Sequence, residues 1–176
     1  GGLSLLIVSC DRYSDLWSPF FSLFWRFWSD CPYPIYLGAN NLIHDDPRVH
    51  TVLIGDDLSW GENTRKLVEG VESPYLLMML EDFFVHRPVV TEEVERCFLA
   101  LRRLQGGYLR LKPFPKPDRE IPGFPEIGEI ERGAPYRAAL QAAIWRKDVL
   151  LSMLRDGENA WDMELLGSRR SDSLTP

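Results

Sequence analysis

Two short apolar runs constrain the fold of this chain more than any other feature. One spans Leu3 to Cys10 and ends at Asp11-Arg12, and the other spans Tyr75 to Leu80 and ends at Glu81-Asp82. Apolar runs of this length suit strands that are buried on both faces of a parallel sheet. Neither run reaches the roughly 18 to 20 residues that a transmembrane helix needs. The sequence therefore predicts buried parallel strands, each followed by polar residues, and no transmembrane segment.

Predicted strands and helices alternate along the first two thirds of the chain. The strands are Leu3–Cys10, 35–38, 50–55, 75–80 and 108–111, and the helices run from Ser14 or Asp15 to about Trp28, from Gly61 to about Val71 and from Thr91 to about Leu104. Ser59 and Glu62 have the spacing of a capping box at the start of the second helix. This alternation predicts an α/β three-layer sandwich with a mainly parallel central sheet.

The last third of the chain is less regular. It predicts a proline-rich loop at 112–125, a strand at 138–145, and helices at 147–154 and 158–166. The polar segment 167–176 predicts a flexible C-terminal tail. With 176 residues in all, we expect a single domain at 1–166 followed by that tail.

Composition excludes several classes of function. The formal net charge of -6 argues against nucleic-acid binding, which depends on Lys and Arg at the phosphates. Three histidines and three distant cysteines make a zinc site improbable and favour a reduced, cytoplasmic protein. Gly-x-Ser-x-Gly, Walker-type and Gly-x-Gly-x-x-Gly motifs are absent, so the hydrolase, P-loop and dinucleotide classes lose their main support.

Polar residues follow four of the predicted strands. They are Ser9 to Arg12, Asn40-Asn41, Asp56-Asp57 and Glu81-Asp82. Ligands of open α/β sheets bind beyond the carboxyl ends of the strands, so these residues mark the expected site. So much negative charge in one crevice is costly unless a cation or hydrogen-bond donors offset it, and a divalent metal with a diphosphate substrate is one such arrangement.

The run Leu-Leu-Met-Met-Leu-Glu81-Asp82-Phe-Phe resembles the GT-A glycosyltransferases, in which an apolar strand leads into an Asp-x-Asp-like motif. The N-terminal Leu-Ile-Val-Ser-Cys-Asp-Arg-Tyr and the helical Asn63-Thr-Arg65-Lys66 are also similar to that family. The resemblance covers about residues 3–84. It implies a nucleotide-diphosphosugar transferase fold, a nucleoside-diphosphate sugar as donor, and a saccharide or other hydroxyl as acceptor. A bacterial enzyme of surface polysaccharide synthesis is one role that it suggests.

The resemblance also implies which residues bind the donor. They are Ser9, Asp11, Arg12, Arg65, Glu81 and Asp82. Asp82 would hold Mg²⁺ or Mn²⁺ at the diphosphate, although some transferases of this fold work without metal and use Arg and Lys instead. The chain departs from the family pattern because Glu81 and Asp82 are adjacent, and adjacent side chains on a strand point to opposite faces.

An inverting transferase also needs a carboxylate that takes the proton from the acceptor hydroxyl. Family members place this base late in the chain, at the start of a helix, and Asp162 and Glu164 are similar to that segment. Side chains two residues apart on a helix point in different directions, so one of the two is expected to face the site. The alternative is a solvated acidic helix with no catalytic part.

Two other functions remain open for the same fold. Nucleotidyltransferases use a related sheet and acidic metal ligands, but they carry a Gly-rich loop after the first strand, where this chain reads Ser9-Cys-Asp-Arg-Tyr-Ser14. A non-catalytic domain that binds a nucleotide or a partner protein is the other alternative, and the atypical acidic motif allows it.

Overall fold

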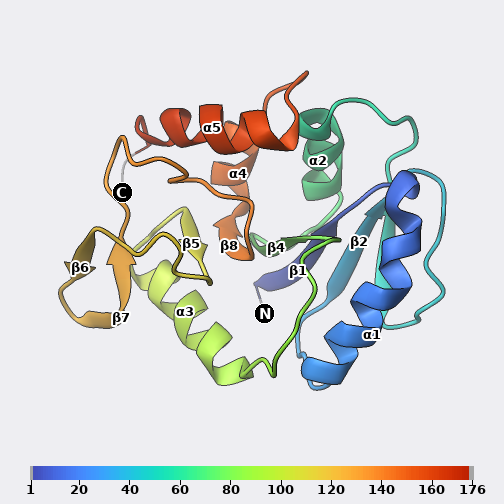
Figure 1. The fold of residues 1–176 in the computed structure, drawn as a ribbon, viewed down its shortest axis with the longest axis horizontal. Coiled ribbons are helices and arrows are strands. Elements are labelled where there is room, and N and C mark those ends of the chain that lie inside the picture. Colours follow the sequence, from blue (N-terminus) through green and yellow to red (C-terminus); the bar gives the residue numbers. More distant parts are fainter. Residues whose placement is uncertain (1, 175–176) are drawn as a thin grey trace.

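One six-stranded sheet forms the centre of the molecule in the computed structural model, which describes residues 2–174 (Figure 1). Its strand order is β3-β2-β1-β4-β8-β5. The strands are β1 (Leu3–Val8), β2 (Ile35–Ala39), β3 (Val49–Leu53), β4 (Tyr75–Leu80), β5 (Tyr108–Arg110) and β8 (Ala143–Arg146). Only β8 is antiparallel to its neighbours, β4 and β5, so the expected mainly parallel sheet is confirmed.

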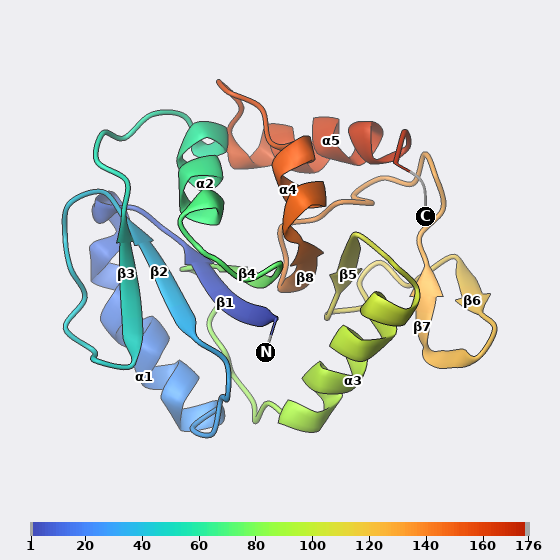
Figure 2. The ribbon, with the colours of Figure 1, turned by 180° about the vertical axis from the view of Figure 1, so that it is seen from behind.

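Helices cover both faces of this sheet, as Figures 1 and 2 show from opposite sides. They are the 3₁₀ segment η1 (Asp11–Leu16) and the α-helices α1 (Trp17–Phe27), α2 (Trp60–Glu69), α3 (Thr91–Arg103), α4 (Lys147–Met153) and α5 (Ala160–Ser171). Leu5 and Ile7 of β1 share one core cluster with α1 and α3. Leu6 and Val8 share the other with α2, α4 and α5. The alternation of side chains along β1 thus produces the three layers.

Local signals set several boundaries. The capping box at Ser59 and Glu62 is present, because the Ser59 hydroxyl accepts from the Glu62 N–H and the Glu62 carboxylate accepts from the Ser59 N–H. The strand predicted at 75–80 and the helix predicted from Thr91 are also found. The first helix begins later than expected, at Trp17, because 11–16 form the 3₁₀ turn η1 instead.

The segment 112–125 was expected to be a loop throughout, but part of it is β-strand. It contains β6 (Arg119–Ile121), which pairs with β7 (Phe124–Glu129) in a hairpin. Gly123 makes the turn with a φ of +82°, a conformation that glycine adopts without steric cost. The predicted strand at 138–145 is likewise shorter and shifted, since β8 covers only Ala143–Arg146.

The expected boundary of the tail at 167 is also wrong, because α5 continues to Ser171. Gly167, Ser168 and Ser171 are buried. The Ser168 hydroxyl accepts a hydrogen bond from the Ala138 N–H, and Arg137 donates to Ser171. This end of the helix is buried and is held by polar contacts. Its sequence therefore lacks the apolar pattern by which a packed helix is recognised. Residues 175–176 of the expected tail lie outside the described residues.

Among the described residues, no helix has both the length and the apolar character that crossing a bilayer requires.

Candidate functional site

The carboxyl ends of β1 and β4 lie side by side, because Val8 is paired with Leu80 in parallel register. The chain passes from β1 through η1 and α1 to β2 on one side, while β4 lies on the other side of β1. This is a topological switch point, where open α/β sheets bind ligands. The register therefore places the segment that begins at Ser9 and the segment that begins at Glu81 at the same edge of the sheet.

Asp11 holds the turn after β2 in place. Its carboxylate accepts hydrogen bonds from the backbone N–H groups of Asn40 at 2.8 Å, Asn41 at 3.0 Å and Leu42 at 3.3 Å. Asn40 returns the contact, since its side-chain oxygen accepts from the Asp11 N–H at 3.0 Å and its amide donates to Gly55 O at 2.9 Å. Asp11 thus joins the segments after β1, β2 and β3 at the carboxyl edge of the sheet.

Ser9 and Arg12 differ in what they contact. The Ser9 hydroxyl is buried and accepts a hydrogen bond from Trp17 Nε1 at 2.8 Å, so it positions the start of α1. Arg12 is exposed on η1, and within residues 2–174 its guanidinium has no ion pair. Of the two residues, only Arg12 has its side chain free for an anionic ligand.

Glu81 and Asp82 lie in different environments, as expected for adjacent residues at the end of a strand. Glu81 is half-buried and Asp82 is exposed. Burial, together with the neighbouring charge of Asp82, raises the pKa of Glu81 to about 7. Desolvation disfavours the ionised form of a carboxyl group, so Glu81 is partly protonated near neutral pH.

Cys10 lies close to this acidic pair. Burial raises the pKa of its thiol, and the charges of Asp57 and Glu81 add to the increase, while backbone hydrogen bonds oppose it. Asp57 belongs to the loop before α2 and accepts from Asn63 Nδ2 at 2.7 Å. Asn63 Oδ1 in turn accepts from the Leu58 N–H at 3.0 Å. The loop after β3 therefore contributes a carboxylate, Asp57, that acts on the thiol of Cys10 as Glu81 does.

Arg65 has a different place from the one that the family resemblance implies. Its guanidinium donates to Leu154 O at 2.7 Å and to Leu151 O at 3.3 Å, and it lies 3.6 Å from the Asp156 carboxylate. These carbonyls belong to the C-terminal end of α4, where backbone oxygens lack partners within the helix. Arg65 thus joins α2 to α4, and the structure does not bring it together with the other expected donor-binding residues.

The two predicted catalytic bases both make structural hydrogen bonds. Asp162 is the third residue of α5 and forms a capping box with Asn159: its carboxylate accepts from the Asn159 N–H at 3.2 Å, and the Asn159 side chain accepts from the Asp162 N–H at 2.9 Å. Glu164 accepts from the Leu140 N–H at 2.8 Å. The spacing of Asn159 and Asp162 is a capping signal that the sequence analysis did not use.

In the part of the chain that the structure describes, protein side chains alone do not form a complete metal site. Within residues 2–174, no three His, Cys, Asp or Glu side chains lie close enough together to hold an ion. Glu81 and Asp82 could supply at most part of a coordination shell, and the oxygens of a bound diphosphate would have to complete it.

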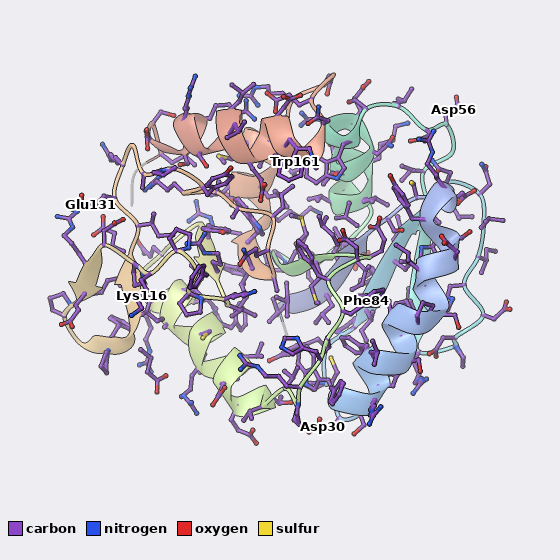
Figure 3. All side chains as sticks on the ribbon, viewed as in Figure 1. Asp30, Asp56, Phe84, Lys116, Glu131 and Trp161 are labelled. Carbon is purple, nitrogen blue, oxygen red and sulfur yellow. The ribbon has the colours of Figure 1, made fainter. Side chains whose placement is uncertain are left out.

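Exposed aromatic side chains lie on the same side of the molecule as the segment that follows β4. Figure 3 shows Phe84 on that segment, where it crosses in front of the sheet, and Trp161 on α5 above it. Trp161 is 71% exposed and Phe84 is 38% exposed. Flat apolar side chains with this exposure are suited to stacking on a sugar or a base.

No family model and no curated protein matches this sequence. Solved structures do match in fold. Two are crystal structures of TarS from S. aureus, one of them of residues 1–349: they align over 96% of this chain with TM-scores of 0.60 and 0.57, at 10% and 9% identity. The chain spans 33% and 55% of the lengths of these two TarS chains.

A further match is 2-C-methyl-D-erythritol 4-phosphate cytidylyltransferase from Thermus thermophilus. It aligns over 95% of this chain and 85% of its own, with a TM-score of 0.52 and 16% identity. The matches together place the fold among the GT-A and cytidylyltransferase-like α/β sandwiches. At these identities the comparisons establish the fold alone.

Proposed function

We propose that this chain binds a nucleoside-diphosphate sugar where β1 meets β4 and transfers the sugar to an acceptor hydroxyl. The observation that carries the proposal is the pairing of Val8 with Leu80, because the segments that carry Arg12 and the Glu81-Asp82 pair both begin at this switch point. The GT-A-like fold supports it. A nucleotidyltransferase is the second candidate, since a cytidylyltransferase has a similar fold, but the segment after β1 lacks the Gly-rich loop of that class.

In this proposal the donor diphosphate lies between Arg12 and Asp82. Mg²⁺ or Mn²⁺ bound by Asp82 and by the diphosphate would neutralise the charge that develops on the leaving group. Without metal, Arg12 would have to provide that neutralisation, and a protonated Glu81 would add no negative charge against it. Asp11, Ser9 and Asn40 hold the surrounding turns in position, which keeps the site organised before the ligand binds.

A thermal-shift series tests donor binding. UDP, GDP, CDP and their sugars are each added with and without Mn²⁺, because a ligand of the folded state raises the melting temperature. We expect one nucleotide to raise Tm in wild type, and we expect Asp82→Asn to lose most of that increase. Asp30→Asn is the matched control, because Asp30 is also exposed and lies at the far end of α1 from the site (Figure 3). No response to any nucleotide, or equal responses in both variants, would exclude this site.

A further inference from the structure

A cavity of about 450 Å³ lies beside β5, the edge strand of the sheet. Its walls come from the end of α3, from the β6–β7 hairpin and from α4, with Leu101, Ile127 and Val149 as representatives. Figure 3 shows Lys116, whose neighbours Pro115 and Pro117 line the cavity, at the opposite end of the molecule from Asp56. The cavity is therefore separate from the site proposed at β1 and β4.

Two buried donors on the cavity wall have no acceptor among the described residues. Trp145, on β8, is 1% exposed and packs on Tyr108 with ring centroids 4.3 Å apart, but its Nε1 has no partner. Nε of Arg110 is also buried without a partner. Buried donors are nearly always satisfied in folded proteins, so each such exception calls for an explanation. A bound ligand that accepts from both groups would supply it.

The same wall carries two guanidinium groups that no carboxylate of residues 2–174 neutralises. Arg110 donates to the carbonyls of Tyr136 and Pro115. Arg137 donates to the carbonyl of Ile130 and to the carbonyl and hydroxyl of Ser171. Within residues 2–174, neither guanidinium lies within 4.0 Å of an Asp or Glu oxygen.

The acidic residues of the cavity wall are already paired elsewhere. Glu126 contacts Arg96 at 3.3 Å, and Glu129 contacts Arg119 at 3.3 Å. These pairs leave Arg110 and Arg137 as cations without counter-ions in a wall that is otherwise rich in Leu, Ile and Pro. Guanidinium groups bind phosphate oxygens well, because their planar donor fork matches the geometry of that group.

We propose that this cavity binds a phosphate monoester that carries an apolar chain. The phosphate would accept from the free donors of Arg110 and Trp145 and would neutralise the charge of Arg110 and Arg137. A phosphate presents oxygens in several directions, which suits donors that come from β5, from β8 and from the segment between them. The apolar chain would lie along the leucine, isoleucine and proline side chains of the wall. This site does not depend on the transferase function.

Calorimetric titration of wild type with n-octyl phosphate tests the site, with inorganic phosphate and n-octanol as the two halves of the probe. We expect octyl phosphate to bind at least tenfold more tightly than either half. Arg110→Gln and Trp145→Phe should each weaken its binding about tenfold, because each removes a donor to a charged group. Arg103→Gln is the control, because Arg103 is exposed on α3 and does not line the cavity.

Circular dichroism of each variant confirms that the fold is retained, and Trp145→Phe decides the question if Arg110→Gln unfolds. Asp82→Asn should bind octyl phosphate as wild type does, which separates this site from the proposed donor site. The proposal is overturned if wild type does not bind octyl phosphate, or if the folded variants bind it with unchanged affinity.

Discussion

Carboxylates with backbone partners differ in role from carboxylates without them. Asp11 accepts from the turn after β2, Asp162 caps α5, and Glu164 accepts from Leu140. The Asp162 cap could have been read from its spacing to Asn159, because both residues belong to one helical turn. The Asp11 contacts could not, because their partners lie about thirty residues further along the chain. The sequence therefore identified candidate acidic residues, but it did not distinguish carboxylates that are free to bind a ligand from carboxylates that hold the backbone in position.

The base assignment predicts a specific result for Glu164→Gln. Glutamine keeps an oxygen that can accept from the Leu140 N–H, so the contact that holds Glu164 is preserved. If Glu164 is the base, release of nucleoside diphosphate should fall by about a hundredfold or more, while the melting temperature stays near that of wild type. Asp162→Asn is the parallel test, since asparagine can also accept in the capping box. Unchanged turnover in both variants would remove these residues from the mechanism.

Glu81 predicts a pH-dependent stability. Its pKa is about 7 in the folded state, against 4.5 for an ordinary Glu. Between these values the folded state binds more protons than the unfolded state, so this group lowers stability as pH rises from about 4.5 to about 7.

Glu81→Gln removes that titration. The variant's unfolding free energy, relative to that of wild type, should be roughly 1–2 kcal/mol higher at pH 8 than at pH 5. This range allows for solvent screening at a half-buried group. Urea unfolding at both pH values measures the difference. Glu72→Gln, at an exposed position before β4, should show no such gain. An equal difference from wild type at both pH values would mean that Glu81 ionises normally.

At the scale of elements, the start of α2 is joined to the turn between α4 and α5. The Gly61 N–H donates to Glu158 O at 3.0 Å, and the Gly157 N–H donates to the Ser59 hydroxyl at 2.9 Å. A side chain at Gly61 would overlap the carbonyl oxygen of Arg155. The sequence showed the helix and its cap, but it did not show this contact, because the two segments are about a hundred residues apart.

Gly61→Ala should therefore destabilise the protein by roughly 1–3 kcal/mol, because a backbone carbonyl cannot move aside as a side chain can. The midpoint of urea unfolding measures this loss. Gly70→Ala is the matched control: Gly70 ends the same helix with a φ of -70°, and an added Cβ would come within 2.9 Å of only a side-chain methyl, that of Val52. Equal stability of the two variants would show that the turn at Arg155 yields easily.

Over the whole molecule, the sequence predicted what depends on burial and missed what depends on polar contacts between distant segments. Buried runs such as Tyr75–Leu80 give the strands, and the residues after them give the expected edge of the sheet. Arg65 was misplaced, because its carbonyl partners on α4 are more than eighty residues away. The end of α5 and the β6–β7 hairpin were missed because serine, arginine and glycine contacts hold them, with little apolar periodicity.

The reversed direction of β8 has a consequence for variation among relatives of this protein. β4 and β5 run in the same direction, and β8 runs antiparallel to both. The chain therefore leaves the sheet after Arg110 and returns at Ala143 at the same end of the strands. Within this stretch, the exposed tip of the β6–β7 hairpin can lengthen or shorten without interrupting a strand of the central sheet, whereas Ala138, Ala139 and Leu140 are buried. Insertions at the tip of this hairpin, around Gly123, would thus reshape the wall of the cavity beside β5 and leave the six-stranded sheet intact.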